Sequence, residues 1–449
     1  MEKSSYRTWT EKLRPMALPA EFQKAYEEWE GEGSLINVNE LKGILSRYDL
    51  RTEKLETLCR YLEEIWESRE VSEYVKFICW TQCDRRYEYF IDGNVDFNLS
   101  GIGDAGKAIN FFICLSCMRQ SEKDLIRRKI PSELYEKIPY RMLDGQIEKY
   151  SRTGELKVDD MPWSLNFYSH SIYLFDRFLF VPCRYDGIYD FYRKDDEVVG
   201  VTAQKLAVDN MGQVINDEES ASDSTEKNGY YYGGFEPERK IKFITQYNED
   251  AENVSGNRLS PCGYITEKIV VLEKRKWNKI LTKDDWMIGF HIPEGEGYTP
   301  EHVRISMKLA MDFFRTYYPE IDFKGFWSAS WLYDGRLSML LSEDSNIVRV
   351  QRQFFNYSGG WNGEMAYIEL FGDLSLKLDE VPMETTLQRR VSVFLKGGGR
   401  LCETGMVYFP EELDKSFEEM IYITSQDLDA EEKLFERNGW KELVYETGN

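Results

Sequence analysis

The stretch DDWMIGFHIPEGEGYTPEHVR, residues 284–304, decides the fold that the sequence predicts. Its first half reads as a buried strand, because apolar residues dominate between polar ends. Its second half starts a helix, since Thr299 suits the N-cap and a proline follows it at the first helical position. A loop with Gly295 and Gly297 joins the two. A strand that leads through a glycine loop into a capped helix is typical of folds in which strands and helices alternate.

The glycine loop has two interpretations. Free backbone N–H groups and the positive end of the helix dipole converge at Gly295 and Gly297, and glycine lets a phosphate approach the chain. The loop would then hold an anionic cofactor. Against this, Glu294 and Glu296 repel a phosphate unless they point away or are paired. The second interpretation is a plain strand-to-helix turn, and residue physics alone leaves both open.

The alternation continues on both sides of this stretch. We expect further helices and strands from apolar runs bounded by turn residues and helix stops. Helices are expected at 299–319, 335–345 and 385–399, and strands at 284–293, 323–333, 346–355, 365–372 and 400–409. This order predicts a mixed sheet with helices packed on it.

The rest of the chain predicts two other regions. Residues 1–155 read as a mainly helical N-terminal domain, because apolar side chains such as Leu58 and Leu62 recur at helical spacing. Residues 156–275 read as a strand-rich middle region with a long acidic loop at about 213–260. Residues 276–449 form the third domain. The predicted fold class is α+β (mixed α/β).

Size, charge and cysteine content limit the function. The 449 residues suit two or three domains. A formal charge of −22, from 57 basic and 79 acidic residues, opposes binding to nucleic acid or anionic membranes. We find neither a signal peptide nor an apolar run long enough to span a bilayer, so we expect a cytoplasmic protein. Its eight cysteines are then reduced thiols.

Two motifs with familiar spacing are rejected. The segment GIGDAGK, residues 101–107, has the glycine spacing of a dinucleotide-binding turn, but no convincing strand is expected before it. Cys79, Cys83, Cys114 and Cys117 have spacings that occur in metal sites. They fall in apolar helices, where cysteine behaves as a small hydrophobic residue, and we predict no metal.

The three histidines are too scattered for a metal site, and His291 is the best placed for chemistry, at the end of a strand beside the glycine loop. A histidine with a structural hydrogen bond is the alternative. Ser330, which precedes Trp331, and Asn346 place polar groups in or beside apolar segments. Such groups either bond structurally or line a pocket.

Several segments together resemble a bacterial group of acyltransferases, in which an N-acyltransferase-type domain precedes a GNAT-like C-terminal domain. The resemblance runs in order from about residue 130 to 405. It rests on residues 254–264, 275–297, 328–354 and 385–399, and on RFLFVPCRY at 177–185, where the group has an arginine before an apolar strand. In one position the sequence departs from acetyltransferases at large. The loop there begins with Gln or Arg, and this sequence has Ile292.

The resemblance implies a splayed mixed sheet that holds an acyl-coenzyme A co-substrate, with its pyrophosphate on the glycine loop. An amine would attack the thioester directly, with a base, an acid and N–H groups to assist. From their placement alone, His291 and Glu294 are the candidates for the base, and Tyr333, near the end of the following strand, is the candidate for the acid. The residues expected to contact the cofactor are Gly295, Gly297, Thr299, Ser330, Trp331 and Asn346.

The sequence leaves three functions. The first is an N-acyltransferase that acts on an amine of a small molecule or peptide, and an acidic, aromatic surface suits a cationic amine. The second is a catalytically silent GNAT-like protein that binds a ligand or partner, favoured by Ile292 and the acidic loop. The third is hydrolysis of an ester or glycoside by paired carboxylates, for which no specific spacing exists. Donor, acceptor and oligomeric state are left open.

Overall fold

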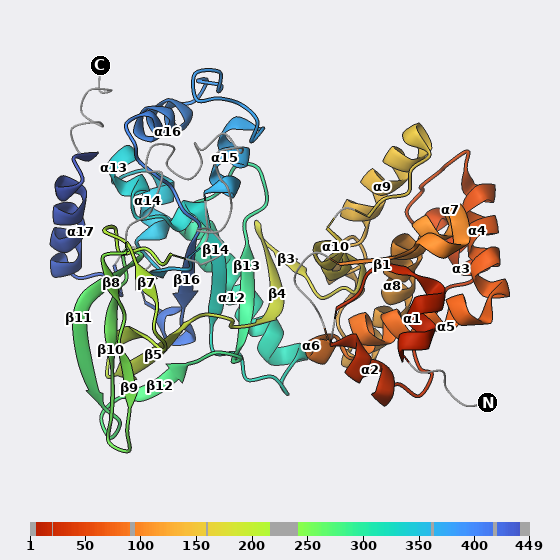
Figure 1. Ribbon diagram of the computed structural model, residues 1–449, viewed down its shortest axis with the longest axis horizontal. Coiled ribbons are helices and arrows are strands. Elements are labelled where there is room, and N and C mark those ends of the chain that lie inside the picture. Colours follow the sequence, from red (N-terminus) through yellow and green to blue (C-terminus); the bar gives the residue numbers. More distant parts are fainter. Residues whose placement is uncertain are drawn as a thin grey trace. The chain divides into compact units, whose positions relative to one another are not determined.

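The computed structural model describes residues 6–19, 21–89, 95–158, 160–215, 241–360, 363–415 and 420–440. The chain divides into two units, residues 1–174 and 175–449 (Figure 1). The first is mainly helical, and the second combines two large sheets with flanking helices. The predicted α+β class is confirmed.

Helices build most of the first unit because their apolar side chains recur on one face. Leu58, Leu62 and Ile65 of one helix are fully buried, as the spacing predicts. The helices are α1 (Tyr6–Leu13), α2 (Phe22–Glu28), α3 (Val38–Arg47), α4 (Leu55–Glu67), α5 (Arg69–Cys79), α6 (Arg86–Tyr89), α7 (Gly103–Lys107), α8 (Ile109–Arg128), α9 (Tyr140–Thr153) and α10 (Met161–Tyr168). A π-helical turn, Trp80–Asp84, follows α5. No described helix is both long and apolar enough to cross a membrane.

The GIGDAGK segment does follow a strand, contrary to our expectation. This strand, β2 (Asp96–Leu99), pairs antiparallel with β1 (Pro15–Ala17) in a two-stranded sheet. A dinucleotide-binding turn needs a parallel βαβ unit, so the pairing still argues against that interpretation. Gly106 has a packing role instead, because a Cβ there would lie 2.0 Å from the Leu99 carbonyl oxygen.

The four closely spaced cysteines lie in the core of the first unit. Cys79, Cys114 and Cys117 are buried, and Cys83 is partly buried. The Cys114 Sγ lies 3.8 Å from the Met161 Sδ, and burial raises the pKa of its thiol. The described residues contain no cluster of side chains suited to a metal ion.

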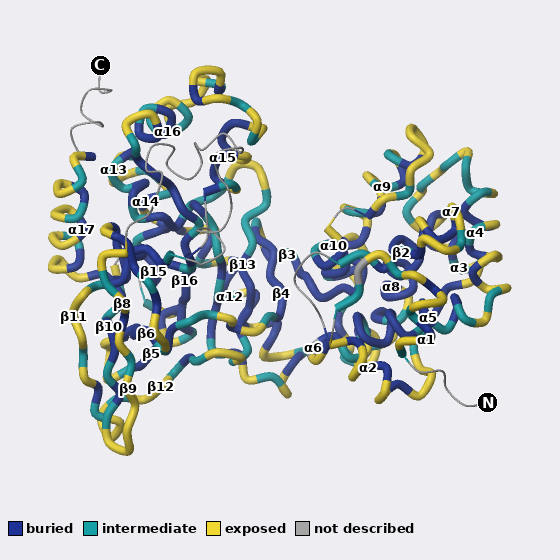
Figure 2. Tube along the Cα trace, in the orientation of Figure 1, coloured by how far each residue is buried: buried dark blue, intermediate teal, exposed yellow. Residues whose placement is uncertain are grey.

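The second unit contains a six-stranded mixed sheet in the order β15-β16-β14-β13-β4-β3. Its strands are β3 (Tyr173–Phe175), β4 (Phe178–Arg184), β13 (Trp286–His291), β14 (Phe326–Ser330), β15 (Phe355–Ser358) and β16 (Thr404–Tyr408). The neighbours β13 and β14 run parallel and are joined by α12 (Pro300–Tyr317). Strand β4 is buried over most of its length, as Figure 2 shows, because it lies inside this sheet.

A second six-stranded sheet follows the path β11-β10-β6-β5-β12, with β9 paired to β10. Its strands are β5 (Tyr189–Lys194), β6 (Glu197–Thr202), β9 (Tyr247–Glu249), β10 (Asn253–Ser260), β11 (Tyr264–Glu273) and β12 (Asn278–Leu281). Strands β7 (Ala207–Val208) and β8 (Phe243–Ile244) form a separate pair. The remaining helices are α13 (Leu337–Leu340), α14 (Asn346–Gln351), α15 (Glu364–Phe371), α16 (Thr386–Lys396) and α17 (Ser425–Arg437).

Three predicted elements are wrong. Residues 346–351 form helix α14 rather than a strand, because the Ser345 hydroxyl accepts a hydrogen bond from the Val348 N–H and caps it. Residues 364–371 form α15, whose buried residues recur at helical spacing. Strand β10 occupies 253–260, inside the predicted acidic loop, and pairs with β11. Part of that loop, residues 216–240, lies outside the described residues.

The two predicted domain boundaries stay predictions. The contacts within the structure divide the chain into two units, with the boundary after Leu174. Around the predicted boundary at 275, strands from both sides are hydrogen-bonded to each other. Strand β12 pairs with β5, and β13 pairs with β4. The strand-rich middle region therefore shares both large sheets with the segment that follows it.

Candidate active site

Strands β13 and β14 separate after a short parallel contact. They pair at only two positions, the second of which joins Gly289 to Trp327. Beyond these positions β13 still pairs with β4 as far as His291, and β14 still pairs with β16 as far as Ser330. Each strand thus stays bonded on its outer side while the inner sides diverge. We call this divergence the β13/β14 fork.

The glycine loop, residues 292–298, connects one side of the fork to α12. The Arg177 guanidinium holds it through three backbone carbonyls. Its Nη2 donates to Pro293 O at 2.5 Å and Gly295 O at 2.9 Å, and its Nε donates to Glu296 O at 2.5 Å. Both glycines have positive φ, 118° at Gly295 and 94° at Gly297, a conformation that other residues rarely adopt.

The amide groups of the glycine loop are left available. Among the described residues, the N–H groups of residues 294–298 donate no hydrogen bond, while carbonyls of the loop face Arg177. The loop leads into α12, where the Thr299 hydroxyl accepts from the His302 N–H at 3.3 Å. Five free amides beside the positive end of a helix are suited to an anion. Glu294 and Glu296 are exposed to solvent, which screens their repulsion.

The three predicted catalytic residues lie in different surroundings. His291 ends β13 at the fork, and burial lowers the pKa of its imidazole to about 4, so it is neutral at pH 7. Glu294 is exposed on the glycine loop. Tyr333 is fully buried and donates a hydrogen bond to the Ser328 hydroxyl at 3.2 Å. Burial raises the pKa of Tyr333, so its phenol stays protonated.

Of the residues expected to contact a cofactor, Gly295, Gly297 and Thr299 lie together at the glycine loop. The other three have different positions. The Ser330 hydroxyl accepts from the Leu332 N–H at 3.2 Å and caps a short 3₁₀ turn. Trp331 belongs to an apolar cluster. Asn346 is exposed at the first turn of α14. Their predicted cofactor contacts stay predictions.

Sequence reasoning gave no role to two residues that the geometry makes prominent. The first is Arg177, which the resemblance included only as an arginine before an apolar strand. The sequence signal for this role is a basic residue one position before a strand, in a chain whose glycine loop is acidic. The second is Tyr298, which follows the second glycine and whose buried hydroxyl has no hydrogen-bond partner among the described residues. No sequence pattern announces it.

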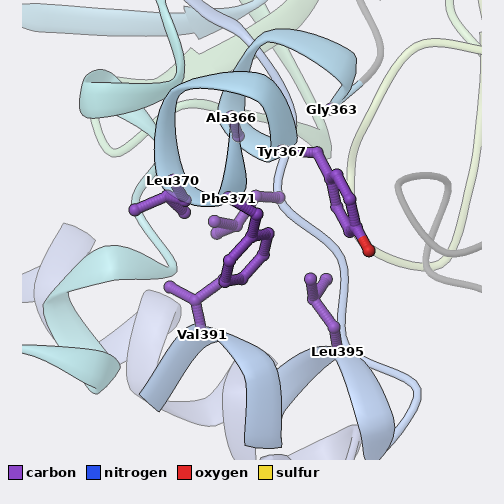
Figure 3. Close-up of a pocket in the computed structure, with 8 residues that line it drawn as sticks. Gly363, Ala366, Tyr367, Leu370, Phe371, Val391 and Leu395 are labelled. Carbon is purple, nitrogen blue, oxygen red and sulfur yellow. The ribbon is translucent and has the colours of Figure 1, made fainter. Parts of the chain in front are cut away.

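A pocket between α15 and α16 is a poor candidate for the site. Figure 3 shows Phe371 of α15 lying toward Val391 and Leu395 of α16. The cavity measures about 10 Å³, the lower limit for a single water molecule. Its lining residues are Gly363, Ala366, Tyr367, Leu370, Phe371, Val391, Leu395 and Leu401. Most of these lining residues belong to one apolar cluster, and they offer no converging polar groups.

The fork and the loop that leads from β13 into α12 define a GNAT-like fold. Residues 217–407 match the family model described as the GNAT-like C-terminal domain. The chain therefore carries such a domain, and the predicted resemblance is confirmed.

Two solved structures are similar to this chain over 90% of its length. An acyltransferase in complex with decanoyl-CoA is 15% identical, with a TM-score of 0.50, over 90% of this chain and 99% of that chain. An acyltransferase in complex with CoA and 10C-teicoplanin is 14% identical, with a TM-score of 0.49, over 90% and 98%. At such identities the likeness concerns the fold. No curated protein sequence matches the chain.

Proposed function

We propose that the protein is an acyl-CoA-dependent N-acyltransferase that moves an acyl group to an amine of a small molecule or peptide. The observation that carries the proposal is the juxtaposition of the β13/β14 fork and the free amides of the glycine loop. The loop would take the pyrophosphate, because its N–H groups and the α12 dipole favour an anion. The pantetheine arm would enter the fork, where the two strand edges no longer pair with each other.

The glycine loop is held ready for this role by Arg177. Three hydrogen bonds to carbonyls fix the peptide planes, so their N–H groups do not have to reorient when a phosphate arrives. The guanidinium also brings a positive charge to a loop that carries Glu294 and Glu296. Arg177 would thereby replace the polar residue that is missing at Ile292.

The proposed reaction is direct transfer. The amine nitrogen attacks the thioester carbonyl carbon, the carbon–sulfur bond breaks, and the amine loses a proton while the thiolate gains one. His291 and Glu294 are the candidates for the base. Neutral His291 can accept the proton, although a pKa of about 4 makes it a weak base. Tyr333, kept protonated by burial, is the candidate for the acid.

The acceptor is proposed to be cationic before it loses its proton. A chain of formal charge −22 attracts an ammonium group and disfavours an anionic acceptor. The proposed donor is an acyl-CoA whose acyl chain length is not specified. Because a protein of similar fold binds decanoyl-CoA, a medium-chain acyl-CoA is the second donor to test beside acetyl-CoA.

The test is calorimetric titration with acetyl-CoA and decanoyl-CoA, followed by an assay of thiol release with a panel of amines. We expect Gly295→Ala to bind at least tenfold more weakly, because a side chain there strains a residue with φ of 118° and shifts the loop. Gly372→Ala is the matched control. It strains a residue with φ of 86° at the end of α15, with nothing within 4 Å of the added Cβ, and should bind like the wild type.

The second candidate function, a GNAT-like binding protein without catalysis, is favoured by the low pKa of His291. Both candidates predict that acyl-CoA binds, and only the enzyme releases free thiol in the presence of an amine. If neither protein form binds any acyl-CoA, the acyltransferase proposal fails. If acyl-CoA binds and no amine in the panel gives turnover, the binding protein is the better account.

A further inference from the structure

Tyr298 follows the glycine loop and packs on β4, the strand beside β13. Its ring packs edge-on against Phe178 of β4, with centroids 6.1 Å apart, and Phe178 in turn packs on Phe290 of β13 at 5.0 Å. Burial raises the pKa of Tyr298, and the electrostatic effect of the Tyr333 phenol raises it further. Tyr333 is bonded to Ser328 of β14. Tyr298 therefore packs on β4, on one side of the fork, while Tyr333 is hydrogen-bonded to β14 on the other side.

The hydroxyl of Tyr298 is buried and finds no hydrogen-bond partner among the described residues. Burying a hydroxyl without a partner is unfavourable, so native structures usually satisfy such groups with protein, water or ligand. The Phe178 ring that packs against Tyr298 offers no acceptor, and the Tyr333 hydroxyl is hydrogen-bonded to Ser328 instead. A ligand that enters the fork would supply one.

We propose that the Tyr298 hydroxyl is a ligand-binding group that hydrogen-bonds the pantetheine arm of coenzyme A close to its pyrophosphate. The inference rests on the proposed function and adds a specific contact to it. Tyr298 directly follows the phosphate-binding glycines, and its hydroxyl reaches only one side-chain length from the loop. The polar groups of coenzyme A at that distance from the pyrophosphate are the hydroxyl and first amide of pantetheine, whereas the thioester lies farther along the arm.

The experiment is calorimetric titration of wild type and Tyr298→Phe with three probes: coenzyme A, acetyl-CoA and 3′-phosphoadenosine 5′-diphosphate. The last has the phosphates of coenzyme A and lacks pantetheine. We expect the variant to bind coenzyme A and acetyl-CoA about five- to tenfold more weakly, by the same factor for both. Its affinity for the nucleotide fragment should equal that of the wild type.

A stability measurement separates this role from a structural one. Phenylalanine removes an unpaired hydroxyl, so the free Tyr298→Phe protein should melt at the wild-type temperature or above it. The matched control is Tyr185→Phe. Tyr185 follows the other end of β4, and its hydroxyl is also buried, close to that of Tyr357. Its variant should keep the wild-type affinity for all three probes.

Three results would overturn the inference. Unchanged coenzyme A affinity in Tyr298→Phe shows that the hydroxyl does not touch the arm. An equal loss for the nucleotide fragment shows a damaged loop, and a loss confined to acetyl-CoA moves the contact to the thioester. If the wild type binds none of the probes, the proposed function itself fails, and this result is distinct from the other three.

Discussion

Strand β14 has two neighbours in the sheet, and the extent of its hydrogen bonding differs between them. On one side it pairs with β16 along all five of its residues, from Phe326 to Ser330. On the other side it pairs with β13 at only two positions. Unpaired backbone groups are unfavourable unless something else bonds them, so the side with missing hydrogen bonds is where we propose that the ligand binds. The fully paired side keeps β14 in position while the fork is open.

The largest expected effect concerns the closed side. Asp334, just after β14, is 2% exposed and accepts two hydrogen bonds from the Arg336 guanidinium at 2.6 Å. It also accepts from the Cys402 N–H at 2.7 Å, on the segment that leads into β16. We expect Asp334→Ala to lower the free energy of unfolding by about 3–5 kcal/mol, because Arg336 is left buried and unpaired. Urea unfolding followed by circular dichroism measures this.

The control for that variant is Asp379→Ala. Asp379 pairs with Lys396 at 3.0 Å and is exposed, so its loss should change the free energy of unfolding by less than about 1 kcal/mol. Equal effects at the two positions would show that the closed side of β14 is not tied down through Asp334.

The second prediction concerns the open side. Arg177→Ala removes three hydrogen bonds to the glycine loop and should weaken acetyl-CoA binding tenfold or more, about 1.5–3 kcal/mol. Arg184→Ala is the control at the other end of β4. Arg184 stacks on Trp286 at 3.7 Å and donates to Asp284 O at 2.9 Å, and its loss should leave the affinity unchanged. Calorimetric titration measures the acetyl-CoA affinity of both variants. An equal loss of affinity in the two would contradict the role of Arg177 in the glycine loop.

The third prediction uses pH and His291, the last residue of β13 at the fork. Its folded pKa of about 4 lies below the ordinary value of 6.5. Between these two values the unfolded chain binds a proton that the folded chain does not, so His291 weakens folding as the pH falls. We expect the stability of wild type relative to His291→Gln to decline below pH 6.5 by at most about 1.4 kcal/mol per pH unit. A difference that stays flat down to pH 4.5 would refute the lowered pKa of the imidazole.

The smallest expected effect compares two helix caps. Thr299 caps α12 at the fork, and Thr385 caps α16, where its hydroxyl accepts from the Gln388 N–H at 3.1 Å. Replacement of either by alanine should lower the free energy of unfolding by about 1 kcal/mol. Only Thr299→Ala should also weaken acetyl-CoA binding, by a few-fold. Similar binding in both variants would mean that the start of α12 does not contact the ligand.

The main features of the fold could be predicted from the sequence. Thr299 and the proline after it predict the start of α12, and the apolar run before the loop predicts β13. Periodicity failed where β-branched and aromatic residues sit in short helices, as in α14 and α15, because tertiary packing outweighs their preference for strands.

The candidate site was only partly accessible to sequence reasoning. The glycine loop is one continuous segment, so Glu294, Gly295 and Gly297 could be placed together. The contact of the loop with Arg177 joins residues more than a hundred positions apart, and local spacing carries no information on such a pair. The fork itself depends on where a ladder of hydrogen bonds stops, and no residue type specifies that point.

The interleaving of the sheets has a consequence for protein synthesis. Strand β4 leaves the ribosome long before its partner β13, which begins only at Trp286. Until then the apolar residues Phe178–Val181, buried in the finished sheet, have no partner strand on that side. Pairing between such distant segments is slow and exposes sticky surface to other chains. We therefore expect nascent chains to expose this apolar strand until β13 has emerged, and pieces cut near residue 275 to aggregate when expressed separately.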